Sequence, residues 1–218
     1  MKYGESSFDI LYLLFAVTSG IIILIRAKNK TERLMGLSAL LLGCGDAFHL
    51  IPRVLNYFVN GDFTASLGAG KLVTSVTMTL FYVLLYYIWL GIYREIRSPG
   101  LTACIGISAV VRIVLCLFPQ NGWLENSSDI TWGIIRNVPF VFLGAVICIL
   151  FFRKRNEEKT FKFFWLYILL SFLFYIPVAV AAGLVPMLGM LMLPKTICYI
   201  LMIVTFLVYQ KKNGKWEG

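Results

Sequence analysis

Ile10–Ile25 reads ILYLLFAVTSGIIILI, an apolar run that ends directly before Arg26 and Lys28. About 20 apolar residues cross a bilayer as a helix, and basic residues mark its cytoplasmic end. The run therefore predicts a first membrane span with its N-terminus outside. Because Glu5 and Asp9 precede the run in place of a basic segment, we expect an uncleaved span rather than a signal peptide.

The composition of the whole chain agrees with a membrane protein. Of its 218 residues, 59% are hydrophobic and only 14% are charged, whereas soluble domains carry about 25% charged residues. The net charge of +9 would suggest nucleic acid in a soluble chain. Here the basic residues cluster in short loops, so no nucleic-acid partner is expected. The five cysteines are scattered singly, which indicates neither a disulfide framework nor a metal site.

Six further apolar segments follow the first, and together they predict a single all-α bundle of seven transmembrane helices over residues 1–218. The spans are expected at about 8–26, 32–52, 69–93, 99–118, 130–152, 161–182 and 188–210. The longest connection, about 53–68, contains the turn-forming Asn60-Gly61-Asp62 and is expected to be flexible.

Basic residues alternate sharply between the two sides of the predicted bundle. One side carries Arg26, Lys28, Lys30, Arg33, Arg94, Arg97, Arg153, Lys154, Arg155, Lys159, Lys162, Lys211, Lys212 and Lys215. The positive-inside rule then predicts an outside N-terminus and a cytoplasmic C-terminus. We expect a multi-pass protein of the cell inner (plasma) membrane, in contact with membrane lipids.

Three basic residues, Arg112, Arg136 and Lys195, fall inside predicted spans. Each costs about 2.5–3.5 kcal/mol at the bilayer centre. Asp46 is the only carboxylate expected at comparable depth, so the three charges predict a partly hydrated outer cavity that attracts an anion. The alternative is that these side chains snorkel to the outer interface.

Asp46, His49 and Arg53 have spacings of three and seven residues, which place them on one face of a helix. A carboxylate beside the only histidine of the chain suits a general base, with Asp46 and His49 as catalytic residues. The alternatives are a structural ion pair and ligand binding without chemistry. One histidine and one aspartate make a poor metal site, and none is expected.

Other polar residues at the same predicted depth complete the candidate ligand site. Lys71 follows Gly68-Ala69-Gly70 at the start of span 3, where helix N–H groups favour an anion. Asn137 and Tyr175 are expected to supply neutral hydrogen bonds. Pro194 precedes Lys195 and predicts a kink that directs the lysine inward.

Aromatic side chains crowd the inner half of span 3. Tyr82, Tyr86, Tyr87, Trp89 and Tyr93 follow one another there, and Trp and Tyr are enriched at membrane interfaces. They therefore predict an interfacial belt.

Four segments resemble a group of small uncharacterised bacterial seven-span membrane proteins. These segments are GDAFHLIPR (45–53), LCLFPQNGW (115–123), RNVPF (136–140) and MLPKT (192–196). The resemblance covers nearly the whole chain and implies the seven-span fold, but it implies no activity.

Three better-known groups are similar in part. Microbial rhodopsins share the span number, the Tyr175-Ile176-Pro177 segment and a lysine in span 7, which implies a retinal-type chromophore on Lys195. SWEET-type transporters share the span number and orientation, which implies movement of a small solute. Lysoplasmalogenase-like hydrolases resemble the Gly45-Asp46 segment, which implies a membrane-embedded hydrolase.

The leading hypothesis is a cationic pocket in the outer half that binds an anionic lipid or a small anion, with no cofactor. Its ligand-binding residues would be Arg53, Lys71, Arg112, Arg136, Asn137, Tyr175 and Lys195. The alternatives are a hydrolase or transferase that uses His49 and Asp46, a small-solute transporter, an opsin-like sensor, and purely structural ion pairs.

Overall fold

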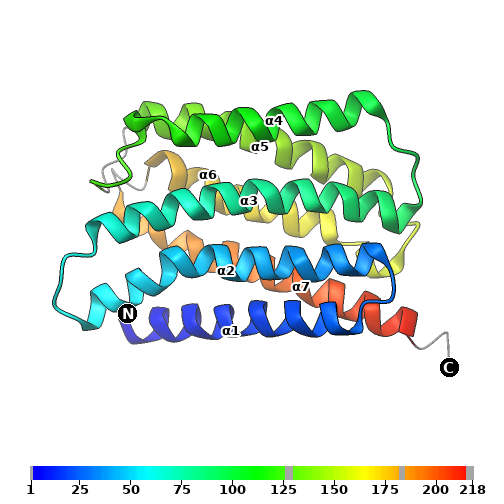
Figure 1. The fold of residues 1–218 in the computed structure, drawn as a ribbon, viewed down its shortest axis with the longest axis horizontal. Coiled ribbons are helices and arrows are strands. Elements are labelled where there is room, and N and C mark those ends of the chain that lie inside the picture. The colour runs from blue at the N-terminus through cyan, green and yellow to red at the C-terminus, as the bar shows by residue number, and fades with distance from the viewer. Residues whose placement is uncertain (1, 126–129, 182–184, 215–218) are drawn as a thin grey trace.

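A computed structural model describes residues 2–125, 130–181 and 185–214. The described chain is entirely helical (Figure 1). Its helices in chain order are α1 (Lys2–Arg26), α2 (Lys30–Phe58), α3 (Thr64–Tyr93), α4 (Pro99–Leu117), η1 (Pro119–Asn121), α5 (Ile130–Arg153), η2 (Lys159–Phe161), α6 (Phe164–Ala181), η3 (Pro186–Leu191) and α7 (Met192–Gly214).

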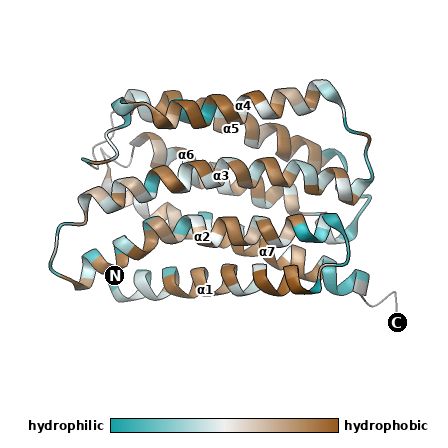
Figure 2. Cartoon of the chain, viewed as in Figure 1, coloured by the Kyte–Doolittle hydropathy of each residue, from teal (hydrophilic) through white to brown (hydrophobic). Residues whose placement is uncertain are grey.

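The predicted seven-helix architecture is confirmed. Seven helices among the described residues are long and apolar enough to cross a membrane, which indicates a polytopic membrane protein. Hydrophobic residues dominate the middle of the helices, and hydrophilic residues gather towards their ends (Figure 2). This distribution fits a hydrocarbon layer around the middle of the bundle.

Consecutive helices run in opposite directions and pack against each other, and α7 returns to contact both α1 and α2. The odd number of helices puts the two termini at opposite ends of the bundle (Figure 1). We call them the N-terminal end, which also carries the α2–α3, α4–α5 and α6–α7 connections, and the C-terminal end.

The connection expected at about 53–68 is mostly helical, and only residues 59–63 separate α2 from α3. The α2 helix continues past Pro52, and its Tyr57 hydroxyl donates to Glu5 Oε2 of α1 at 3.1 Å. Asp62 Oδ1 accepts the backbone N–H of Thr64, the first residue of α3, at 2.9 Å and so satisfies one donor that a helix start leaves unpaired. These contacts support helical structure beyond the apolar part of each span.

Gly68 and Gly70 lie inside α3 rather than in a flexible loop. A Cβ atom on Gly70 would overlap the Phe48 carbonyl oxygen of α2, and one on Gly68 would overlap the Trp123 carbonyl oxygen. Because neither glycine has a side chain, α3 can approach both α2 and the α4–α5 connection closely. These contacts set the distance between the walls of the N-terminal end.

We expect Gly70→Ala to lower the free energy of unfolding by about 1–3 kcal/mol, because overpacking forces the backbones of α2 and α3 apart. Gly106→Ala on α4 is the matched control, since its added Cβ meets no atom within 4 Å. There the better helix propensity of alanine is expected to leave stability equal or higher. Thermal unfolding of the purified variants in detergent tests this, and equal Tm values for the two would contradict it.

Tyr82, Tyr86 and Trp89 of α3 do not belong to an interfacial belt as predicted, because they are buried in the bundle core, whereas Tyr87 and Tyr93 are half-buried. The polar atoms of the three buried residues find partners within the protein. The Tyr86 hydroxyl pairs with Thr102 Oγ1 at 2.8 Å, and Trp89 Nε1 donates to the Leu150 carbonyl at 3.1 Å. These hydrogen bonds supply what interfacial water would otherwise provide.

Pro194 does not kink α7 as predicted. It lies in the first turn of the helix, directly after the 3-10 turn Pro186–Leu191. A proline is well tolerated there because the first N–H groups of a helix have no partner within the helix. The position of Lys195 therefore follows from where α7 begins and not from a kink.

Candidate functional site

A cavity of about 500 Å³ lies within the N-terminal end of the bundle. Its volume is in the usual range for small-molecule sites. Each of the α-helices α2 to α7 contributes residues to its wall, together with the turn after α4. The lining residues are His49, Lys71, Thr74, Ser75, Met78, Arg112, Asn121, Gly122, Trp123, Ile130, Gly133, Arg136, Asn137, Phe140, Tyr175, Val178, Ala179, Val180, Met192 and Lys195.

The fold brings most of the predicted site residues together in this wall. Those that line it are His49, Lys71, Arg112, Arg136, Asn137, Tyr175 and Lys195, and the two predicted residues that do not are Asp46 and Arg53. The seven predicted residues that line the cavity come from helices far apart in the sequence, so only the packing of α2 to α7 makes them one site.

Arg112 of α4 is almost fully buried, with 1% of its surface exposed. Its Nη1 donates to Asn137 Oδ1 at 2.6 Å and also contacts the Arg136 carbonyl oxygen. The guanidinium lies over the Phe140 ring, 4.3 Å from its centroid. Because these partners are all neutral, they satisfy donors of Arg112 without cancelling its charge. Snorkelling, the alternative for this residue, is excluded by its burial.

Asn137 is the centre of this hydrogen-bond network. Its Oδ1 accepts from both Arg112 and the Tyr175 hydroxyl, the latter at 2.8 Å, and its Nδ2 donates to the Gly133 carbonyl at 2.8 Å. One amide therefore links α4, α5 and α6 and fixes the positions of Arg112 and Tyr175.

Arg136 is held by the turn that follows α4. Its Nη1 donates to Asn121 Oδ1 at 2.7 Å, and its guanidinium stacks over the Trp123 ring at 4.4 Å. Asn121 itself is buried and donates to the carbonyl oxygens of Leu115 and Phe118, both at 2.8 Å. The turn is thus ordered by the end of α4 and in turn orients Arg136.

Lys195 is also buried, with 7% of its surface exposed. Its Nζ lies 4.8 Å from the centroid of the Tyr175 ring and 5.3 Å from that of Tyr199. Such cation–π contacts favour a desolvated ammonium group but leave its charge in place. No hydrogen bond or ion pair of Lys195 is found within the described parts of the chain.

His49 and Asp46 do not form a hydrogen-bonded dyad with each other. Asp46 Oδ2 accepts from the Tyr12 hydroxyl of α1 at 2.7 Å. His49 lines the cavity and is hydrogen-bonded to the backbone of Leu67. Its buried Nδ1 has no partner among the described residues. The two side chains thus have different partners, and their catalytic roles stay a prediction.

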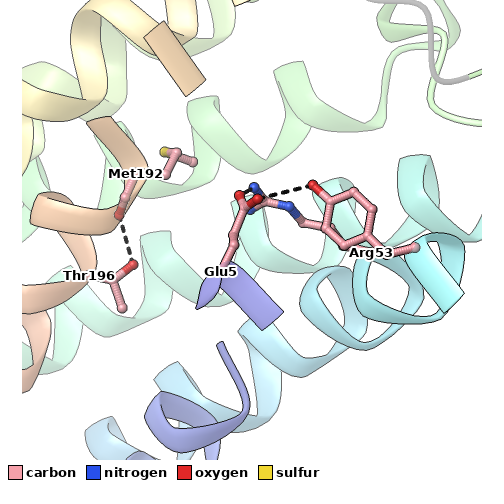
Figure 3. A network of polar contacts seen from close by, with 5 residues as sticks. Glu5, Arg53, Met192 and Thr196 are labelled. Carbon is pink, nitrogen blue, oxygen red and sulfur yellow. Dashed lines mark hydrogen bonds and ion pairs between the residues drawn. The ribbon is translucent and has the colours of Figure 1, made fainter. Parts of the chain in front are cut away.

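Arg53 is paired with Glu5 of α1 and does not reach the cavity wall. Figure 3 shows this contact together with the hydroxyl that donates to Glu5. In the same view Thr196 Oγ1 donates to the Met192 carbonyl at 2.9 Å in the first turn of α7. Arg53 therefore joins α1 to α2, and its place in the ligand-binding set has no support from geometry.

The wall of the cavity is strongly unbalanced in charge. Lys71, Arg112, Arg136 and Lys195 contribute cationic groups, and no aspartate or glutamate is among the described lining residues. The wall also contains apolar side chains of α5 and α6, including Ile130, Val178 and Val180. The lining therefore combines cationic and apolar side chains, which suits an anion that carries an apolar part.

Several residues of the site were missed by the sequence analysis. Asn121 and Trp123 belong to the segment LCLFPQNGW, and both contact Arg136. These contacts depend on how the turn folds, so the sequence alone does not reveal them. Tyr199 lies one turn after Lys195, so helical spacing alone could have predicted that it neighbours this lysine.

The expectation that Asp46 is the only carboxylate at this depth was wrong. Asp9 of α1 is buried, with 4% of its surface exposed. The sequence analysis placed Asp9 at the outer edge of the predicted first span, about 8–26, whereas α1 begins at Lys2, so that Asp9 lies inside the helix and packs into the bundle.

We expect Asn137→Ala to lower the free energy of unfolding by about 2–4 kcal/mol, because it leaves Arg112 buried with fewer acceptors and Tyr175 without one. The matched control is Asn56→Ala, whose side chain is exposed on α2. Thermal unfolding in detergent measures both changes. A Tm loss for Asn137→Ala no larger than that of the control would contradict the network's structural importance.

Comparison with known proteins finds no matching family model, no similar curated protein and no similar solved structure. The resemblances drawn from the four sequence segments therefore stay predictions.

Proposed function

We propose that the cavity binds an anionic ligand with an apolar part, such as a lipid headgroup or a small organic phosphate or carboxylate. The observation that supports the proposal is the charge of the wall, which holds four basic side chains and, in its described part, no acidic one. Arg112 is buried and Arg136 is half-buried, and both have only neutral partners among the described residues. A buried charge without a counter-charge is costly. An anion in the cavity would supply that counter-charge.

The basic residues would have different roles in binding. Lys195 would contact the anion directly, because its ammonium group faces the cavity with aromatic rings as its neighbours. Arg136 would present the donors that Asn121 does not use, in the planar arrangement that suits phosphate and carboxylate. Arg112 is tied into the Asn137 network and would act mainly through its charge.

The apolar wall supports an amphiphilic rather than a fully hydrated ligand. Phe140 covers one face of the Arg112 guanidinium and Trp123 one face of that of Arg136. Val178, Val180 and Met192 are among the apolar side chains that line the same cavity. An inorganic anion would leave these surfaces in contact with water. A ligand with a short apolar segment would bury them and gain the corresponding free energy, about 25 cal/mol per Å².

The cavity would open on the extracytoplasmic side of the cell membrane. It lies at the N-terminal end of the bundle, and the loops of the C-terminal end carry most of the basic residues. Basic loops stay on the cytoplasmic side during insertion. This argument supports the predicted orientation, with the N-terminus outside and the C-terminus in the cytoplasm.

Binding is tested with purified protein by native mass spectrometry in detergent, using a phosphatidic acid and a fatty acid as probes and phosphatidylcholine as the zwitterionic comparison. We expect the wild type to retain an anionic probe, and Arg136→Gln/Lys195→Met to bind it at least about tenfold more weakly, since each lost charged contact is worth about 1.5–3 kcal/mol.

The control is Arg153→Gln/Lys211→Met, which removes the same two charge types from exposed positions at the C-terminal end. It should bind like the wild type. Equal weakening in both double variants would indicate nonspecific attraction to the basic surface, and no retained anion in the wild type would contradict the proposal.

Orientation is tested by fusing green fluorescent protein or alkaline phosphatase to the C-terminus and expressing each fusion in a bacterial inner membrane. We expect the fluorescent fusion to be bright and the phosphatase fusion to be inactive, because the C-terminus would be cytoplasmic. Fusions to a variant that lacks α7 should give the reverse pattern. An active phosphatase on the full chain would place the C-terminus outside and the cavity on the cytoplasmic side, and would contradict the proposed orientation.

A further inference from the structure

Three basic residues of the cavity wall, Arg112, Arg136 and Lys195, are joined through direct contacts. Arg112 Nη1 donates to Asn137 Oδ1 at 2.6 Å, and the same oxygen accepts the Tyr175 hydroxyl at 2.8 Å. Lys195 Nζ lies 4.8 Å from the centroid of the Tyr175 ring. Arg136 precedes Asn137 on α5, and its carbonyl oxygen is in contact with Arg112 Nη1. Contacts, and not only a shared cavity, therefore bring the three residues to one region of the wall.

These cations keep N–H groups that the described residues do not use. A guanidinium has five N–H donors, but Arg112 and Arg136 each donate through Nη1 alone to the described part of the chain. Lys195 makes cation–π contacts there and donates no hydrogen bond. The region can therefore offer several charge-assisted hydrogen bonds to one ligand.

The same region carries more positive charge than a singly charged ligand can offset. Asp46 attracts Lys195 but is not among the described lining residues. If its charge is set against that of Lys195, the charges of Arg112 and Arg136 remain, because the partners of both guanidinium groups are neutral. Two buried or half-buried positive charges are best offset by two negative charges on the ligand.

We propose that the ligand of the cavity carries a phosphate monoester group, an inference that rests on the anion site proposed above. Such a group has a charge of about −1.5 to −2 at pH 7 and three strong acceptor oxygens. Its oxygens can accept from donors on α4, α5 and α7. A carboxylate has one charge and two oxygens, and the diester of an ordinary phospholipid has one charge and two free oxygens, so both match the wall less well.

Arg136 has the clearest geometry for the phosphate contact. Trp123 stacks on one face of its guanidinium, and Asn121 accepts from its Nη1 at 2.7 Å. The Nε and Nη2 groups remain, and they lie on one edge of the guanidinium plane. Two parallel N–H groups on such an edge suit two oxygens of one phosphate.

The size of the cavity restricts the rest of the ligand. A volume of about 500 Å³ suits a small molecule, and apolar side chains are part of the lining. A short chain or a ring beside the phosphate would fit, whereas the acyl chains of a two-chain lipid would remain outside. The phosphate monoester could belong to a membrane amphiphile or to a water-soluble metabolite.

The requirement for two charges is tested by isothermal titration calorimetry of the purified protein in nonionic detergent at pH 8, where a phosphate monoester is a dianion. Hexyl phosphate is compared with hexyl sulfate, which has the same chain and three terminal oxygens but a single charge, and with heptanoate. We expect hexyl phosphate to bind at least about tenfold more tightly than either, as one further charge-assisted hydrogen bond predicts. Titration into detergent without protein corrects for uptake by micelles.

Glycerol 3-phosphate and inorganic phosphate distinguish the two sources of the group. Weaker binding of both than of hexyl phosphate would support a membrane amphiphile. Equal binding of glycerol 3-phosphate and hexyl phosphate would support the phosphate group and would overturn the apolar part of the ligand, which indicates a soluble source.

Lys195→Met removes one positive charge from the wall, so the remaining charge suits a monoanion. Its preference for hexyl phosphate over hexyl sulfate should fall to less than about threefold, and Arg136→Gln should show the same change. Lys211→Met, an exposed change on the same helix as Lys195, should keep the preference of the wild type. Because the preference is a ratio within one variant, a partial loss of folded protein does not change it.

Hexyl sulfate or heptanoate that binds the wild type as tightly as hexyl phosphate would overturn the phosphate assignment and leave the anion site in place. A preference that stays unchanged in Lys195→Met and in Arg136→Gln would also overturn it. Failure of all three hexyl-length anions to bind would instead contradict the proposed anion site itself, so the two failures are distinguishable.

Discussion

The central constraint on this protein is the cost of removing ionised side chains from water. Arg112, Lys195 and Asp9 are all buried in an otherwise apolar bundle, where the attraction and repulsion between charges are much stronger than in water. Each must find compensation in a neighbouring group or a ligand. The packing of the N-terminal end is organised around this requirement, while the C-terminal half of the core is filled with aromatic and aliphatic side chains.

Neutral groups provide much of the support for the basic residues. Asn137 and Asn121 accept from Arg112 and Arg136, and the rings of Phe140, Trp123 and Tyr175 cover the flat or apolar surfaces of the cations. These contacts fix the geometry of the donors without neutralising them. A site assembled in this way keeps its positive potential available to a ligand, whereas salt bridges would have cancelled it.

Positive and negative charges are separated within the same end of the bundle. The basic residues converge from α3, α4, α5 and α7 on the cavity, and the two aspartates lie on α1 and α2. Lys195 stands between the groups, since it lines the cavity and is attracted by Asp46. Close backbone contacts at Gly68 and Gly70 hold α3 between the two regions and so keep the separation fixed.

The sequence by itself determined the number of helices, their order and the asymmetry of charge between the ends, because these depend on the local density of apolar and basic residues. It also identified the basic residues of the cavity wall, since a charged residue in or beside an apolar run is conspicuous without any structure. Only the tertiary structure decided the partners. Arg53 turns to Glu5, Asp46 turns to Tyr12, Asp9 enters the bundle and the α3 aromatics fill the core, because each of these contacts joins helices whose relative rotation no single helix encodes.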